Sequence, residues 1–149
     1  FISIPPFDFP ANWNDTAQYY GFTSIASFYD YFVNTIVHKS IVDPLRAEFP
    51  NTTIFTIPTG WAALNLLQMK QDGLLLDSIN LSGPQATSLF TDAKGHQGQI
   101  ITETGTLMWM KGIYQEDLGS NSHQTGFNTD LHGLADQIMS DHDPLYNQY

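Results

Sequence analysis

Apolar residues recur every three or four positions in four stretches of the chain, a spacing that places them on one face of an α-helix. The longest stretch begins after Thr23 and Ser24, either of which can cap a helix, and runs to Pro44. We expect Pro44 to disrupt this helix near its end, with residues 45–49 as a last turn. Its apolar face consists of Ile25, Phe28, Tyr29, Phe32, Val33, Ile36 and Val37.

Three further helices are predicted from the same spacing. One follows Gly60 and ends at Gly73, one covers residues 97–115, and the last begins after Asp130, which suits a helix cap. In the helix between Gly60 and Gly73, the residues that share one face are Ala63, Leu66, Leu67 and Lys70. The inward positions of the second are Ile100, Ile101, Thr104, Leu107 and Met108, with Trp109 as a further candidate. Those of the third are Leu131, Leu134, Ala135, Ile138 and Met139.

Two short segments have the composition of β-strands. The composition of residues 1–4 predicts a short buried strand, which ends at the pair of prolines that follows. Residues 51–57 are β-branched and aromatic and follow a helix, so we expect 53–57 to be an interior strand of a parallel sheet. The turn-rich segments 7–22 and 74–91 are predicted to be loops, the second with a turn at 82–84, and 119–128 is a polar loop.

This order of elements indicates a layered α/β fold. Two strands are fewer than such a fold needs, because a parallel sheet is wide and carries helices on both faces. We therefore expect residues 1–149 to form a single α/β domain or the C-terminal half of one, with 119–149 as a loop and helix extension. On this interpretation the first residues are a strand without its beginning, and more chain precedes them.

Composition narrows the class of protein. A length of 149 residues fits one domain, and 42% hydrophobic residues suffice for a packed core. The net charge of -10 repels nucleic acid and anionic membrane surfaces, and no apolar run is long enough to span a bilayer. The absence of cysteine removes disulfides, thiolate metal sites and cysteine nucleophiles. It is also compatible with a secreted or periplasmic protein.

The clearest candidate for chemistry is the pair Asp92 and His96. The two residues lie four positions apart on a loop, just before a predicted helix. A carboxylate in this position can fix the tautomer of the imidazole, which then moves a proton. The alternative is a structural loop in which Asp92 caps a turn and His96 caps the helix. A matching nucleophile is missing, since Ser122 follows a helix rather than the end of a buried strand.

Three blocks in this order resemble the C-terminal half of the SGNH (GDSL-type) hydrolase superfamily, over about residues 23–117. They are Pro-Leu-Arg-Ala-Glu-Phe-Pro at 44–50, Thr-Ile-Phe-Thr-Ile-Pro-Thr-Gly at 53–60, and Leu-Phe-Thr-Asp-Ala-Lys-Gly-His at 89–96. In that superfamily the last block carries the Asp and His of the catalytic triad as Asp-x-x-His. Here the spacing is one residue longer.

The resemblance implies a three-layer α/β/α, flavodoxin-like parallel sheet and a serine-type esterase, lipase or carbohydrate deacetylase without a cofactor or metal. Asp92 and His96 would be catalytic, acting on a lipid, small-molecule or carbohydrate ester. The serine would come from a second polypeptide segment. Asn14, in Asn-Trp-Asn-Asp, echoes the Gly-x-Asn-Asp block of the family without its glycine and is a candidate for substrate binding.

Trp61 is the second candidate for substrate binding. It follows the expected carboxyl end of a strand, where ligands of open α/β sheets bind, and we expect residues 58–61 to share a cleft with His96. A packed Trp61 without function is the alternative. For the whole chain the rival hypotheses are a non-catalytic α/β subunit or binding domain, and a carbohydrate-binding module, which the helix content disfavours.

The remaining histidines need no function on sequence grounds. His38, late in the first helix, is expected to interact with the helix dipole. The run Asp141-His142-Asp143, with His123 and His132 nearby, is interpreted as a solvated helix end rather than a metal site.

Overall fold

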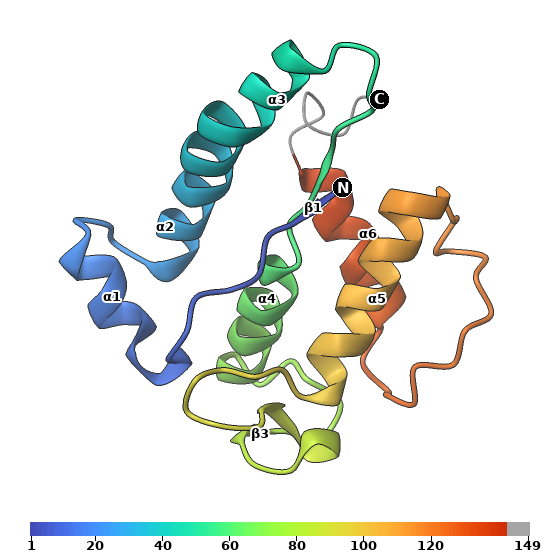
Figure 1. The fold of residues 1–149 in the computed structure, drawn as a ribbon. Helices are drawn as coiled ribbons and strands as arrows, with labels where there is room; N and C mark the ends of the chain where they lie inside the picture. The colour runs from blue at the N-terminus through green and yellow to red at the C-terminus, as the bar shows by residue number, and fades with distance from the viewer. Residues whose placement is uncertain (143–149) are drawn as a thin grey trace.

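The computed structural model describes residues 1–142, and helices form most of that part of the chain. The first predicted helix is confirmed as one long rod, built from α2 (Ile25–Tyr31), the π-helix η2 (Phe32–Val42) and α3 (Asp43–Glu48) (Figure 1). Ser24 caps it, because its hydroxyl accepts the Ser27 N–H while Ser27 bonds back to the Ser24 backbone.

The sequence predicted that Pro44 would disrupt this helix, but the rod continues through Pro44. The Asp43 N–H donates to the carbonyl of His38, five residues back, so the hydrogen bonding is still of the π type there. Pro44, which has no N–H to donate, stands at the start of α3. The hydrogen bonding thus changes from π-helical to α-helical next to Pro44, the residue without an N–H group.

Helices α4 (Gly60–Gln71), α5 (Gln99–Tyr114) and α6 (Leu131–Asp141) confirm the other three predictions. Asp130 caps α6 by accepting the Gly133 N–H at 2.9 Å. All five expected inward positions of α5 are fully buried. The further candidate Trp109 is 41% exposed and lies against the ring of Phe1 instead.

The prediction of a loop over 7–22 was wrong, because a 3-10 turn η1 (Pro10–Asn12) leads into the helix α1 (Trp13–Tyr19). Trp13 and Ala17 lie one turn apart, and both are buried. The Trp13 indole N–H also donates to the carbonyls of Phe7 and Asp8. Aromatic and turn-forming residues around these two positions hid the helical spacing.

Two small parallel sheets make this a mixed α/β chain. Strand β1 (Ile2–Ser3) pairs with β2 (Thr56–Ile57), which confirms a buried parallel strand near residue 56. An interior position is not found, since within residues 1–142 β2 has β1 as its one neighbour. The second sheet, β3 (Asn80–Ser82) with β4 (Ser88–Phe90), lies in the expected loop 74–91 and was missed. A further 3-10 turn, η3 (Gln85–Thr87), joins its strands.

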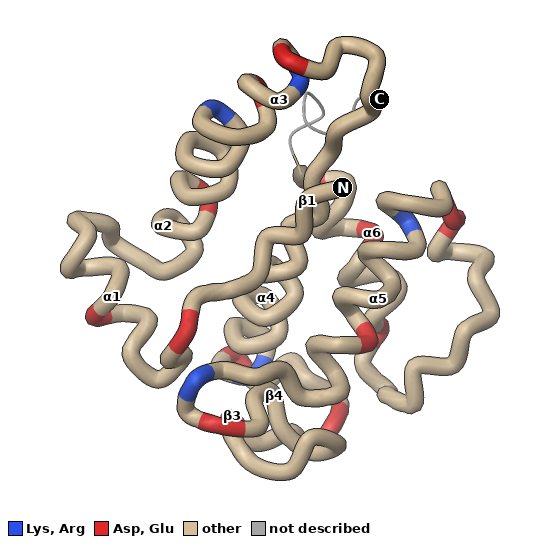
Figure 2. The backbone as a smooth tube through the Cα atoms, in the orientation of Figure 1, with Lys and Arg blue, Asp and Glu red and all other residues tan. Residues whose placement is uncertain are grey.

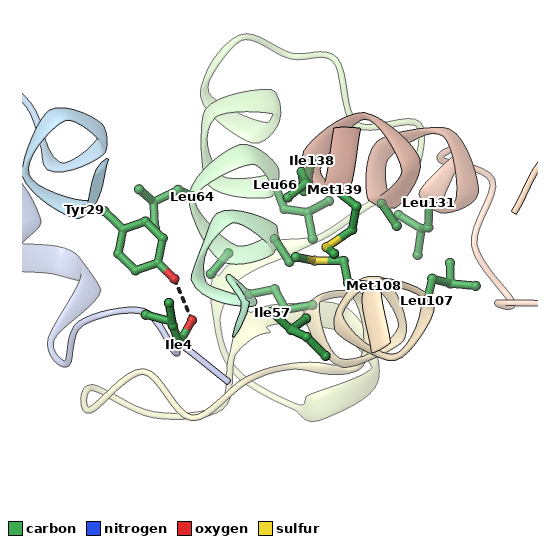
Figure 3. Close-up of a cluster of buried hydrophobic side chains, with 14 of the residues drawn as sticks. Ile4, Tyr29, Ile57, Leu64, Leu66, Leu107, Met108, Leu131, Ile138 and Met139 are labelled. Atoms are coloured by element: carbon green, nitrogen blue, oxygen red, sulfur yellow. Dashed lines mark hydrogen bonds between the residues drawn. The ribbon is translucent and has the colours of Figure 1, made fainter. Parts of the chain in front are cut away.

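The core joins these elements through apolar contacts and through the buried hydroxyl of Tyr29 (Figure 3). Leu107 and Met108 of α5 lie toward Leu131 and Met139 of α6. The Tyr29 hydroxyl donates to the Ile4 carbonyl at 2.5 Å and accepts the Gly60 N–H at 3.0 Å. Burial raises the pKa of this hydroxyl, so it stays protonated and ties the rod to α4 and to the residue that follows β1.

Acidic residues are scattered over many elements rather than gathered in one run (Figure 2). Among the described residues, no helix has the length and apolar character that crossing a membrane requires.

Candidate functional site

The loop 91–98 joins β4 to α5 and is closed at its base by backbone contacts. Phe90 and Gln97 form an antiparallel bridge, and the Thr91 N–H donates to the His96 carbonyl at 2.7 Å. The Gly98 N–H donates to the Leu89 carbonyl at 2.6 Å. A Cβ atom on Gly98 would lie 1.8 Å from the Ser88 carbonyl oxygen, so this closure requires glycine.

Asp92 organises the loop that it begins. Its Oδ1 accepts the backbone N–H groups of Lys94, Gly95 and His96 at 2.9, 3.1 and 3.3 Å. Its Oδ2 bonds directly to the Nδ1 of His96. The hydrogen bond from the His96 side chain is the main cause that lowers the pKa of Asp92. The carboxylate is therefore ionised at neutral pH and held in one orientation.

This geometry determines the tautomer of His96. An ionised carboxylate can only accept, so in the neutral form of the imidazole Nδ1 carries the proton and the lone pair lies on Nε2. The His96 side chain is 71% exposed and that of Asp92 45% exposed, so Nε2 can reach a solvent-borne or partner group. Within residues 1–142 no serine hydroxyl is hydrogen-bonded to this ring. The expected contact between the two side chains is confirmed, and their catalytic role stays a prediction.

Contacts with the segment after β1 set the position of the loop. The Phe9 N–H donates to the Lys94 carbonyl at 3.2 Å, and Gly95 packs against Pro10. Gly95 has a φ of 91°, and a Cβ atom there would lie 2.9 Å from Pro10 Cδ. The loop thus lies on the carboxyl-end side of the β1–β2 sheet, the side where α/β proteins bind ligands.

The two predicted substrate-binding residues come together, but not with His96. Trp61 of α4 and Asn14 of α1 line one cleft of about 340 Å³. His96 is not among its lining residues, so this cleft does not confirm the expectation that residues 58–61 share a cleft with His96. Pro10 links the two regions, since it lines the cleft and contacts Gly95.

A buried polar cluster, missed in the sequence, joins three elements. The Thr56 hydroxyl lies 2.7 Å from the Nε2 of His38 and 2.7 Å from the Nε2 of His142. One hydroxyl donates a single proton, so at most one of the two imidazoles accepts from it and at least one donates to it. His38 and His142 are both buried, so the interpretation of His142 as part of a solvated helix end is wrong, while the interaction of His38 with the helix dipole stays a prediction. Asp143 of that run lies outside the described residues.

A second exposed imidazole–carboxylate pair provides a comparison for Asp92 and His96. His123 Nε2 lies 3.0 Å from Glu103 Oε2, with its ring 6.5 Å from that of His132. Over residues 1–142 no group of three acidic or histidine side chains has the geometry to hold a metal ion.

No family model, curated protein or solved structure matches this chain. The function is therefore inferred from the geometry of the Asp92–His96 loop.

Proposed function

We propose that this chain supplies the Asp–His part of the active site of an SGNH-type serine ester hydrolase. The observation that carries the proposal is an exposed imidazole whose Nδ1 is held by an ionised carboxylate. Three backbone N–H groups hold the other oxygen of the same carboxylate. This arrangement orients a general base and leaves its reactive nitrogen open.

His96 performs the proton transfers in this mechanism. Its Nε2 takes the serine proton as the hydroxyl attacks the ester carbonyl and forms a bond from oxygen to the acyl carbon. The imidazolium then protonates the leaving alcohol as the old ester bond breaks, and a water molecule releases the acid by the same steps. The negative charge of Asp92 stabilises the imidazolium in each half of the reaction.

The serine comes from a further segment, in the same polypeptide or a second one, that extends the sheet toward a three-layer flavodoxin-like architecture. Two features support this part of the proposal. Within the described chain β1 and β2 have one hydrogen-bonded neighbour each, which leaves an edge on both. The loop of Asp92 and His96 also lies on the carboxyl-end side of that sheet, where a strand-end serine would be presented.

Ester hydrolysis by the full-length protein tests the proposal. We expect turnover of p-nitrophenyl acetate or butyrate, and a decrease in kcat/KM of about 10³-fold or more in His96→Ala. His123→Ala is the matched control, because it removes another exposed imidazole that contacts a carboxylate. Its kcat/KM should equal that of the wild type.

A fluorophosphonate probe locates the nucleophile in the same samples. We expect one labelled serine outside residues 1–149, and slower labelling in His96→Ala. Turnover by residues 1–149 alone would place the nucleophile inside this chain. Equal hydrolysis rates in His96→Ala and the wild type would exclude His96 as the general base, and no hydrolysis of any ester would identify a non-catalytic α/β domain instead.

A further inference from the structure

The cleft that contains Trp61 and Asn14 has walls from five parts of the chain, one of them Leu81 of β3. Helix α4 forms one wall, and η1, α1 and the start of α2 form the opposite side. Its volume of about 340 Å³ falls within the range of small-molecule sites.

Helix α4 presents both apolar and amide side chains along this wall. The positions recur every three or four residues, so they share a helix face: Trp61, Leu64, Asn65, Gln68 and Gln71. Asn65 Nδ2 donates to the Trp61 carbonyl at 2.9 Å, and Gln68 Nε2 donates to Asp72 at 3.0 Å. Both side chains act as donors in these bonds, so the amide oxygens of Asn65 and Gln68 can accept a hydrogen bond from a ligand.

The cleft is uncharged. None of the described residues that line it is Asp, Glu, Lys, Arg or His, although the chain has a net charge of -10. An ionic ligand would lose hydration there without gaining a partner. A purely apolar ligand would bury the amides of Asn14 and Gln71 and the amide oxygen of Asn65 without hydrogen bonds, which is also unfavourable.

We infer that this cleft binds a neutral saccharide. A sugar ring combines a C–H face, which packs on an indole or aliphatic side chain, with hydroxyls that both donate to and accept from amides. The half-buried Trp61 and Leu67 provide the first kind of surface, and Asn14, Asn65 and Gln71 provide the second. Binding needs no chemistry at His96, so this inference goes beyond the proposed hydrolase and stands independently of it.

Calorimetric titration of the full-length protein with cellotetraose, xylotetraose and mannotetraose tests this site. We expect at least one of them to bind with a Kd on the order of 10 μM to 1 mM. Gln71→Ala and Asn14→Ala should each weaken that binding roughly 5-fold, as expected for one lost hydrogen bond. Gln18→Ala, at an exposed glutamine of α1 outside the cleft, is the matched control and should bind as the wild type does.

Two comparison ligands and one variant make the result decisive. Tetragalacturonate and decanol, one charged and one mostly apolar, should bind less tightly than the neutral sugars. His96→Ala should keep the sugar affinity whether or not it loses ester hydrolysis. Absence of sugar binding up to about 10 mM, equal affinity in all variants, or preference for either comparison ligand would overturn the inference.

Discussion

Asp77 and Asp92 are two loop carboxylates with similar local geometry and different surroundings. Asp77 accepts the backbone N–H and side-chain amide of Asn128 on Oδ1, both at 3.0 Å. Its Oδ2 accepts the backbone N–H of Thr129 at 2.9 Å and the hydroxyl at 2.7 Å. Asp92 instead binds three N–H groups of its own loop on one oxygen and the His96 imidazole on the other.

The comparison shows that a lowered carboxyl pKa does not by itself mark a functional site. Burial acts to raise the pKa of Asp77, but the hydrogen bonds from Asn128 and Thr129 together lower it. The pKa of Asp92 is lowered as well, chiefly by the His96 side chain. Asp77 is saturated by neutral donors and joins two distant loops, whereas Asp92 holds a group that can itself accept a proton. The partner of the second oxygen therefore distinguishes a structural clamp from a candidate catalytic pair.

The largest expected difference between the two carboxylates is in catalysis. Asp92→Asn keeps the side-chain shape but donates to the ring, which favours the wrong tautomer of His96. We expect kcat/KM for ester hydrolysis to fall by about 10² to 10⁴-fold. Asp77→Asn is the matched control and should leave the rate within about 2-fold of wild type. Equal losses in the two variants would mean that Asp92, like Asp77, is structural.

The free energy of unfolding should show the opposite order, with a larger loss from the change at Asp77 than from the change at Asp92. Asp77→Ala removes four hydrogen bonds and leaves the buried Thr129 hydroxyl without its acceptor, so we expect a loss of about 1–2 kcal/mol in the free energy of unfolding. Asp92→Ala should cost less, because its partners lie in one solvated loop. Urea unfolding followed by circular dichroism measures both values. A larger loss for Asp92→Ala would show that the 91–98 loop is the main structural clamp.

The smallest expected effect of the two carboxylates is on the way the stability of the fold decreases at acidic pH. A carboxyl whose pKa is lower in the folded than in the unfolded state stabilises the fold above its unfolded pKa. That stability is lost as the pH falls through the folded pKa. Both carboxylates should thus contribute to a decline that begins below about pH 4. Asp77→Asn should flatten the dependence of the melting temperature on pH between about 4 and 2. An unchanged slope would show that the clamp does not depend on ionisation.

Local patterns in the sequence predicted the helices, caps and contacts that depend on residues close together in the chain. The spacing of apolar residues located the rod and helices α4, α5 and α6, and Ser24 and Asp130 were recognisable as caps. The contact between Asp92 and His96 was predictable for the same reason, since one short loop contains both residues and the N–H groups that orient them. Where apolar spacing was masked by turn residues, as in α1, the local pattern failed.

Contacts between distant positions were decided only by the tertiary structure. The Asp77 clamp joins residues 51 and 52 positions apart, and the Thr56 hydroxyl reaches His38 and His142 across 18 and 86 positions. The pairing of β3 with β4 and the separation of His96 from the Trp61 cleft have the same origin. The sequence around a polar side chain does not specify which distant group will form a hydrogen bond with it. That choice is made when packed helices and strands exclude water and each buried polar group takes the partner that the fold brings within reach.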